Sequence, residues 1–396
     1  MTSSTATAIV GARLFDGVDW HEDATLVIED GKIIALDTHA TSPGKMEQID
    51  AHGYLLVPGF VDLQVNGGGG VLFNNMPTLD GIARICSTHA AFGTTALLVT
   101  LITDTPETGF QAVAAGKAAR EACIPGYLGL HLEGPHISQV RKGTHDPAQI
   151  RPMEAVDLEA LCRSRDAVGT LLATVAPENV SPDQVAALAR AGIVVSLGHT
   201  DASCKAAKTY AAAGATMVTH LFNAMSPLGH REPGLVGAAL DTGTLHCGLI
   251  ADGFHVDPLT MGVALRAKRG PGHLFLVTDA MSTIGSDQDG FELNGRRVYR
   301  RDGRLTLADG TLAGADIDML SSVRYVYERV GLPLEEALRM ASVYPAEAIG
   351  AANKGCLKPG CDADFLLLSP NLDLHSTWIS GNCVFNASAE NEHLRV

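Results

Sequence analysis

Six short segments of this 396-residue sequence carry side chains that bind metal ions or transfer protons. Two imidazoles and one carboxylate form a common open site for a catalytic divalent ion, and Glu133, His199 and His220 could supply them. A water molecule in the remaining ligand position would have its pKa lowered towards ~7. Asp279 could then accept the water proton and transfer it to a leaving group. The six segments are residues 62–67, 131–136, 198–200, 219–223, 252–255 and 278–280.

Each of these side chains also has an ordinary structural explanation. A single histidine at a strand end usually makes a structural hydrogen bond, and a single aspartate beside glycine usually belongs to a turn. Asp279 could instead orient a metal-binding histidine. His131 and Glu133 lie two residues apart and face the same way in a strand, so we expect His131 to be a buried support one layer deeper. Turns alone explain six such segments poorly, which favours a shared functional site.

The elements that would position these side chains alternate between strand and helix. Short apolar runs predict eight strands, and Ala-rich stretches between them predict helices, for example over 158–165, 182–191 and 202–213. Continuous apolar strands separated by helices indicate a parallel sheet that is covered on both faces. Eight such units fit a (β/α)8 barrel, whose active site lies at the carboxyl ends of its strands. The predicted strands are residues 55–65, 95–100, 127–133, 171–176, 193–198, 217–222, 247–251 and 274–278.

The two ends of the chain differ from this middle part. Short β-forming runs occur near both termini, and Asp30-Gly31 and Gly381-Asn382 supply turn signals between them. We therefore predict one small β-domain built from residues 1–54 and 356–396, and a barrel over residues 55–355. The predicted strands of the small domain are residues 8–10, 26–28, 33–35, 364–368, 376–379 and 384–385.

The composition argues against several classes of function. The sequence has 29 Lys and Arg against 44 Asp and Glu, a net charge of −15, so we expect no nucleic-acid partner. No apolar run approaches the ~20 residues of a transmembrane helix, so we expect no membrane partner. The N-terminal residues lack the charged and apolar regions of a signal peptide. The eight cysteines form no CxxC pair and are expected to be reduced, structural thiols of a cytoplasmic protein.

Seven motifs occur in a fixed order along the chain. They are VPGFVD at 57–62, HLEGP at 131–135, GHT at 198–200, HLFNAM at 220–225, REPG at 231–234, IADGFHV at 250–256 and LVTDA at 276–280. Each motif is weak alone, but the ordered set resembles the amidohydrolase superfamily and, within it, the N-acetylglucosamine-6-phosphate deacetylase family. The resemblance extends over nearly the whole chain. It implies an α/β fold, a TIM-like (β/α)8 barrel of the amidohydrolase type with a small β-sandwich domain formed by both termini.

The resemblance also implies an activity and a set of site residues. The activity is hydrolysis of the acetamide of N-acetyl-D-glucosamine 6-phosphate, by a cytoplasmic homodimer with one divalent metal ion per chain. By position, Glu133, His199 and His220 match the metal ligands, Asp279 matches the catalytic acid and base, and His145 matches a residue that polarises the substrate carbonyl. Contacts to the substrate are implied for Gln64, Asn66, His145, Asn223, Ala224, Arg231, His255, Leu312, Ala313 and Gly314.

A dianionic phosphate needs a local cationic pocket in a protein of this net charge. Arg231 is the best candidate, because its planar guanidinium fits phosphate with two hydrogen bonds, and His255 could add a further donor. The alternative is that Arg231 and Glu232 form an ion pair within a loop.

One departure from the wider superfamily bears on the metal. Many members carry His-x-His at the end of the first strand and bind two ions, whereas this chain has Gln64-Val65-Asn66 there. Neutral amides are poor ligands beside imidazole, so a second ion is expected to bind weakly or not at all. Zinc is favoured for the remaining site, although Fe²⁺, Mn²⁺ and Co²⁺ also suit two histidines and a carboxylate.

Three alternatives to the main interpretation stay open. The substrate could be N-acetylgalactosamine 6-phosphate. The chain could be another amidase or a deaminase of the superfamily, although these usually need the His-x-His pair. It could also be a binding or scaffold protein without catalysis, for which loss of Asp279 or of a metal ligand would be expected, and none is lost.

Overall fold

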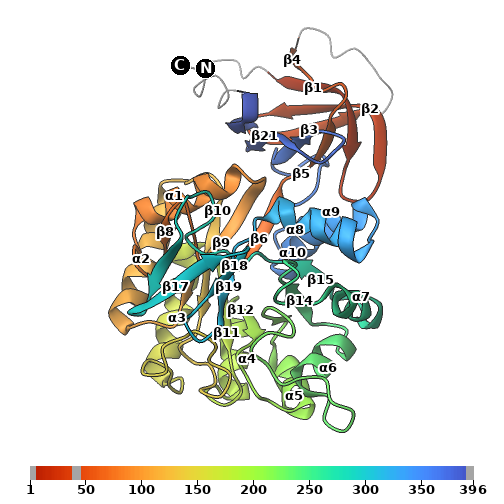
Figure 1. Ribbon diagram of the computed structural model, residues 1–396. Helices are drawn as coiled ribbons and strands as arrows, with labels where there is room; N and C mark the ends of the chain where they lie inside the picture. Colours follow the sequence, from red (N-terminus) through yellow and green to blue (C-terminus); the bar gives the residue numbers. More distant parts are fainter. Residues whose placement is uncertain (1–5, 38–45, 389–396) are drawn as a thin grey trace.

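The computed structural model describes residues 6–37 and 46–388. Figure 1 shows a barrel with helices around it and, above the barrel, a second sheet built from both ends of the described chain. Residues 1–5, 38–45 and 389–396 of the predicted small domain lie outside the described residues. Within the described ranges, no helix has the length and apolar character needed to cross a membrane.

The barrel sheet contains eight strands, and strands that are consecutive along it pair in parallel. This confirms the predicted fold class and the order of the eight predicted strands. Their nearly unbroken burial explains why they read as continuous apolar runs in the sequence. The strands are β6 (Phe60–Val65), β9 (Thr94–Ile102), β10 (Tyr127–Glu133), β11 (Thr170–Val175), β12 (Val194–Leu197), β13 (Met217–Val218), β14 (His246–Leu249) and β15 (Leu274–Leu276).

The prediction of one strand over residues 55–65 was wrong, because the structure has two strands there. Strand β5 (Leu55–Pro58) pairs with terminal strands and only β6 belongs to the barrel. Gly59 joins them at a point where a Cβ atom would lie 2.1 Å from Thr95 Oγ1. The upper sheet therefore continues past residue 54, and the domain boundary placed there stays a prediction.

The barrel closes between its first and last strands through residues of the predicted site. The Asp279 amide donates to the Gln64 carbonyl, and the Asn66 amide donates to the Ala280 carbonyl, both at 2.9 Å. Below them, the Thr278 hydroxyl donates to the fully buried Asp62 carboxylate at 2.6 Å. Burial raises the pKa of Asp62 to about 7, although the Thr278 hydrogen bond opposes this.

Helices cover the outside of the barrel, and the three predicted examples are confirmed as α3, α4 and α5. Side chains cap several of them at the N-terminus, as Ser181 does for α4 by accepting from the Gln184 amide. The helices are α1 (Leu79–Ala90), α2 (Pro106–Glu121), α3 (Ala155–Val168), α4 (Pro182–Arg190), α5 (Cys204–Ala213), α6 (Gly234–Asp241), α7 (Pro258–Ala267), α8 (Met319–Tyr325), a π-helical turn (Val326–Val330), α9 (Leu334–Ala341) and α10 (Val343–Ala348).

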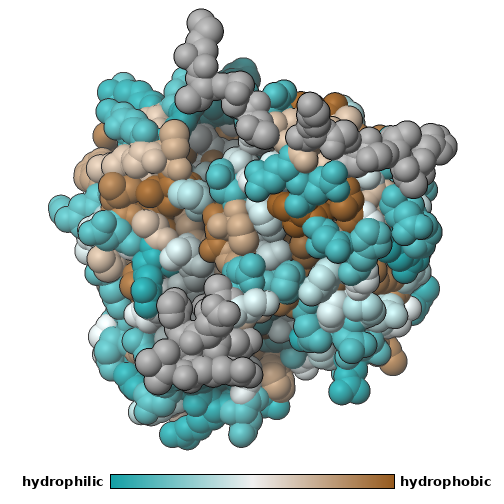
Figure 2. Space-filling model, turned by 90° about the horizontal axis from the view of Figure 1, so that it is seen from above, coloured by the Kyte–Doolittle hydropathy of each residue, from teal (hydrophilic) through white to brown (hydrophobic). Residues whose placement is uncertain are grey.

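The upper sheet has eight described strands in the order β22-β21-β20-β5-β1-β2-β3, with β4 beside β1. It has its own hydrophobic core, which includes Leu14, Leu26 and Phe365. Seen from above, hydrophobic residues form separate patches among hydrophilic ones (Figure 2). The strands other than β5 are β1 (Thr7–Phe15), β2 (Trp20–Glu29), β3 (Lys32–Asp37), β4 (Glu47–Asp50), β20 (Phe365–Leu368), β21 (Leu374–Ile379) and β22 (Asn382–Asn386).

An antiparallel sheet that was not predicted from the sequence follows the last barrel strand. Asp316 fixes it to the barrel by accepting hydrogen bonds from Arg300 Nε at 2.7 Å and Thr283 Oγ1 at 2.8 Å. This position brings the residues of β19 to the mouth of the barrel. The strands are β16 (Gly290–Leu293), β17 (Arg296–Arg301), β18 (Arg304–Thr306) and β19 (Leu312–Ala315); a shorter hairpin, β7 (Gly67–Gly68) and β8 (Val71–Leu72), follows β6.

Candidate active site

Three side chains predicted to bind metal meet at the carboxyl ends of barrel strands β10, β12 and β13, with β11 between the first two. Glu133 ends β10, while His199 and His220 follow β12 and β13. Glu133 Oε1 lies 3.2 Å from His199 Nε2 and 3.1 Å from His220 Nε2. The two Nε2 atoms are 3.1 Å apart. All three side chains are buried, so their charges interact with little screening by solvent.

The backbone is strained at several of the predicted site residues. His199, His220 and Asp279 have φ angles of 47°, 29° and 51°, in the left-handed region that non-glycine residues rarely adopt. They lie two, two and three residues beyond the ends of β12, β13 and β15. Strain of this kind is concentrated at functional sites, because the surrounding structure must hold it in place.

The contacts of His199 test whether this cluster fits a metal ion. Its Nδ1 lies 2.8 Å from the Arg141 carbonyl oxygen. Since a carbonyl only accepts, Nδ1 donates, and Nε2 of a neutral ring therefore carries a lone pair. In a neutral ring that lone pair faces the Glu133 carboxylate, which is repulsive unless a proton or a metal ion lies between them. Atoms 3.1 to 3.2 Å apart also suit ligands placed about 2.0–2.2 Å from one ion. The residues therefore fit a divalent ion.

The electrostatics of the cluster point the same way. Burial alone would raise the pKa of Glu133, but hydrogen bonds with His199 and His220 hold it well below its usual value. Burial alone would lower the pKa of His220, but its contact with Glu133 raises it. The cluster therefore keeps an anionic carboxylate and attracts positive charge, either a proton or a metal ion.

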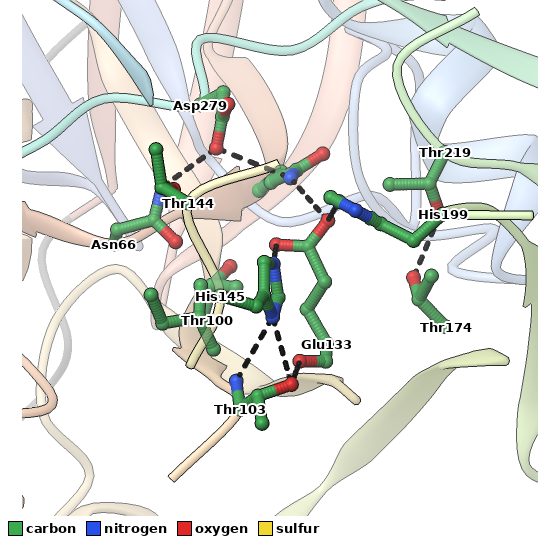
Figure 3. Close-up of polar contacts among 12 residues, drawn as sticks. Asn66, Thr100, Thr103, Glu133, Thr144, His145, Thr174, His199, Thr219 and Asp279 are labelled. Atoms are coloured by element: carbon green, nitrogen blue, oxygen red, sulfur yellow. Dashed lines mark hydrogen bonds and ion pairs between the residues drawn. The ribbon is translucent and has the colours of Figure 1, made fainter. Parts of the chain in front are cut away.

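His145 is a further histidine of the site (Figure 3). Ligand atoms of Glu133, His145 and His199 all lie within 4.8 Å of one another, so this group is also a possible metal site. However, His145 Nε2 is 3.9 Å from Glu133 Oε2, farther than either of the predicted histidine ligands is from Glu133. Burial and the neighbouring His199 lower the pKa of His145 to about 3, so the ring is neutral.

The side-chain amide of Gln64 lies between the carboxylates of Asp279 and Glu133. Gln64 Nε2 donates to Glu133 Oε1 and to Asp279 Oδ1, both at 3.1 Å. Asn66 Nδ2 also donates to Asp279 Oδ1. Burial and the charge of Glu133 raise the pKa of Asp279 to about 6, while His220 and the Asn66 hydrogen bond oppose that rise. A carboxylate with this pKa can both accept and release a proton near neutral pH.

A cavity of about 370 Å³ opens over these groups. Its walls come from the loops after the barrel strands and from β19. The structure therefore brings most of the sequence-predicted residues into one space. Those that line it are Glu133, His145, His199, His220, Asn223, Ala224, His255, Asp279, Leu312 and Gly314.

Four predicted substrate contacts do not line this cavity. Gln64 and Asn66 are buried beneath it, where their amide groups are bonded to carboxylates. Ala313 is fully buried between its two lining neighbours on β19. Arg231 is exposed on the loop before α6, outside the cavity lining. The pair proposed between Arg231 and Glu232 is not seen either, because Glu232 Oε1 accepts from the Cys204 and Gly234 amides.

His131 has the supporting place expected for it. It is 1% exposed, and its Nε2 lies 2.7 Å from Thr174 Oγ1, which in turn lies 2.7 Å from Thr219 Oγ1. Burial lowers the pKa of His131 to about 4. The ring therefore fills the barrel interior as a neutral hydrogen-bonding group.

Two residues near the ligands were missed by sequence reasoning. Arg141 lines the cavity, and its guanidinium pairs with Asp201 at 2.6 Å. Thr103 contacts His145 through Nδ1, with the backbone amide at 3.3 Å and Oγ1 at 2.7 Å. Arg141 lies four residues before His145 and could have been noticed there. Thr103 gave no signal, because it is one of several threonines that follow apolar residues.

A (β/α)8 barrel with a possible metal site and a buried carboxylate of raised pKa at the carboxyl ends of its strands defines an enzyme of the barrel hydrolase class. A sequence model of the protein family described as "Amidohydrolase family" matches residues 55–384. The chain belongs to this family.

Similar proteins extend over almost the whole chain. A protein named N-acetylgalactosamine-6-phosphate deacetylase, from Shewanella sp. (strain ANA-3), is 39% identical over 381 residues, which are 95% of each chain. A protein named N-acetylglucosamine-6-phosphate deacetylase, from Haemophilus influenzae, is 34% identical over 378 residues, 94% of this chain and 98% of the other. The crystal structure of N-acetylglucosamine-6-phosphate deacetylase from Pasteurella multocida has a TM-score of 0.92 and 36% identity, covering 96% of this chain and 99% of that one.

Proposed function

We propose that this chain is a metal-dependent deacetylase that hydrolyses the acetamide of N-acetyl-D-glucosamine 6-phosphate to D-glucosamine 6-phosphate and acetate. The observation that carries the proposal is the buried cluster of Glu133, His199 and His220 beside Asp279, in a cavity of the size a small substrate needs. The names of the similar proteins supply the substrate class.

Glu133, His199 and His220 are the proposed ligands of one divalent ion per chain, and zinc is the proposed metal. Such an ion, when bound, supplies Lewis-acid polarisation of the amide carbonyl and lowers the pKa of a water molecule. The arrangement has one carboxylate and two imidazoles and leaves the cavity side open, which suits a catalytic rather than a structural ion.

The chain's own residues provide the proton transfers. Asp279, as the ionised base, accepts a proton from the attacking water and then donates it to the departing amide nitrogen. His145 donates a hydrogen bond to the substrate carbonyl as negative charge develops on its oxygen. Gln64 and Asn66 orient Asp279 through their amide groups and favour its ionised form.

The sugar phosphate is proposed to contact Asn223, Ala224 and His255, which line the cavity, and the backbone at 312–314. His255 is held by Asp252, whose Oδ2 lies 2.6 Å from Nδ1. Arg231 is the proposed phosphate ligand, although it lies outside the cavity lining of its own chain. We also propose that the protein is a cytoplasmic homodimer. Each chain is proposed to consist of a terminal β-domain at 1–54 and 356–396 and a barrel at 55–355.

Acetate release tests the proposed function directly. The purified chain, with and without added zinc, is given N-acetylglucosamine 6-phosphate, its galactosamine isomer and unphosphorylated N-acetylglucosamine. Metal-dependent release that is fastest from N-acetylglucosamine 6-phosphate supports the proposal. Faster release from the galactosamine isomer would contradict the assigned sugar, and release from none of the three would contradict the activity.

A further inference from the structure

Two histidines of the cavity have opposite backbone partners. His199 Nδ1 lies 2.8 Å from a carbonyl oxygen, that of Arg141. His145 Nδ1 lies 3.3 Å from a backbone N–H, that of Thr103, and this N–H points at the ring nitrogen. A carbonyl accepts and an amide donates, so the two contacts require opposite protonation of Nδ1 in neutral rings.

The consequence for each ring follows at its other nitrogen. His199 carries its proton on Nδ1, which leaves the Nε2 lone pair free for a cation. His145 accepts at Nδ1 and so carries its proton on Nε2, the atom that lies 3.9 Å from Glu133 Oε2. An Nε2–H group can donate a hydrogen bond but has no lone pair for a metal ion.

The Thr103 hydroxyl strengthens this arrangement. Its Oγ1 lies 2.7 Å from His145 Nδ1 and 3.4 Å from the Glu133 carbonyl oxygen. The hydroxyl therefore donates its hydrogen bond mainly to His145 Nδ1, the nearer acceptor. Figure 3 shows both Thr103 atoms meeting the same edge of the His145 ring. Thr103 and His145 are both buried, so no solvent competes for these contacts.

The Thr103 hydroxyl packs closely against the backbone of Gly134. A Cβ atom on Gly134, whose φ is +91°, would lie 2.1 Å from Thr103 Oγ1. Thr103 follows β9 directly, and Gly134 follows Glu133 at the end of β10. The hydroxyl is therefore enclosed between the end of β10, which carries Glu133, and the His145 ring.

We propose that Thr103 is a positioning residue that holds His145 as the Nε2–H tautomer, so that His145 donates into the cavity and does not bind the metal ion. The part of this inference that concerns turnover rests on the proposed deacetylase function. The tautomer itself does not.

The tautomer is measured by two-bond ¹⁵N–¹H correlation spectra of the zinc-loaded protein labelled in its histidine rings. The His145 signals are those absent from the His145→Gln spectrum. We expect His145 to have a protonated Nε2 and an unprotonated Nδ1 in the wild type and in Thr103→Ser. An unprotonated Nε2 in the wild type would overturn the proposal.

The effect on turnover is measured with Thr103→Val. A methyl group cannot approach Nδ1 to 2.7 Å, so the ring must move, and a shift of about 1 Å can cost up to about 100-fold in rate. We expect kcat to fall about tenfold or more, with KM changed less than about threefold and zinc content unchanged. Thr103→Ser should keep kcat within about threefold, as should the matched control Thr108→Val, whose hydroxyl contacts Thr105.

A double-mutant cycle shows whether Thr103 acts through His145. Thr103→Val should lower kcat in the wild type but by less than about twofold when His145 is already glutamine. Full additivity, or loss of zinc from Thr103→Val, would overturn the proposal. A wild-type protein that releases no acetate would contradict the proposed function alone, because the spectra still decide the tautomer.

Discussion

Asn66 Nδ2 donates a hydrogen bond to Asp279 Oδ1 at 2.6 Å. The contact links the first and last strands of the barrel at the point where the sheet closes. Gln64, two residues earlier, donates to the same oxygen and to Glu133. The amides at this strand end therefore orient carboxylates. That a second metal ion binds weakly or not at all beside this Gln-x-Asn pair stays a prediction.

Asp279→Asn should retain zinc and substrate binding but lower kcat. General acid–base catalysis typically contributes about 10²- to 10⁴-fold, and we expect a loss in that range. Steady-state kinetics with N-acetylglucosamine 6-phosphate measure it, with zinc content determined on the same samples. The exposed Asp287→Asn is the matched control and should be unchanged. Turnover of Asp279→Asn near the wild-type rate would show that Asp279 is not the acid and base.

The pH profile should have an acid limb set by Asp279. The base must be ionised, and the pKa of Asp279 is raised to about 6 without metal, so a bound cation places the limb at or below pH 6. Below the limb, kcat/KM falls as the carboxylate is protonated. Asn66→Leu removes a hydrogen bond that lowers this pKa, so its limb should move to higher pH. An unchanged or lower limb in Asn66→Leu would contradict this role of Asn66.

Zinc binding should release protons. The contact with Glu133 raises the pKa of His220, so in the metal-free protein a proton occupies the cluster to a higher pH than in an isolated histidine. Zinc must displace that proton, so its affinity should fall as the pH falls, by up to about tenfold per pH unit. Calorimetric titration in buffers of different ionisation enthalpy counts the released protons. Equal heats in all buffers would mean that His220 is unprotonated before zinc binds.

Arg231→Ala should weaken phosphorylated substrates selectively. Hydrogen bonds to charged groups contribute about 1.5–3 kcal/mol, which corresponds to a rise in KM of about 10- to 100-fold. The KM for unphosphorylated N-acetylglucosamine should change by less than about threefold. Arg269→Ala removes another exposed arginine, which pairs with Asp241, and serves as the control. Equal losses with both substrates would show that Arg231 does not contact phosphate.

Much of the barrel could be predicted from sequence because burial on both faces produces continuous apolar strands. The same signal misled at residues 55–65, where two buried strands of different sheets follow each other with Gly59 between them. Nothing in local hydrophobicity reports which sheet a buried strand joins. The antiparallel sheet over β16–β19 was missed because β17, with the sequence RRVYRR, has one buried residue and reads as a charged surface segment.

The site was predictable in its residue types but not in all of its geometry. Glu133, His199, His220 and Asp279 follow apolar runs, so the barrel rule alone brought them together. The left-handed backbone at His199 and Asp279 has no local sequence signal, because glycine is the residue that such angles favour. The position of Arg231 depends on how a loop folds, and hydrophobic periodicity does not describe loops.

The pairing of β5 with β20 sets an order on the folding of this protein as it is synthesised. Leu55 and Leu368 are partners in that ladder, so an N-terminal strand waits for one of the last segments to leave the ribosome. All barrel strands emerge earlier than β20, and the barrel can therefore close first. Until β20 has been synthesised, β5 has an open edge, which could pair with another nascent chain. A chain that stops before Phe365 would keep that edge permanently.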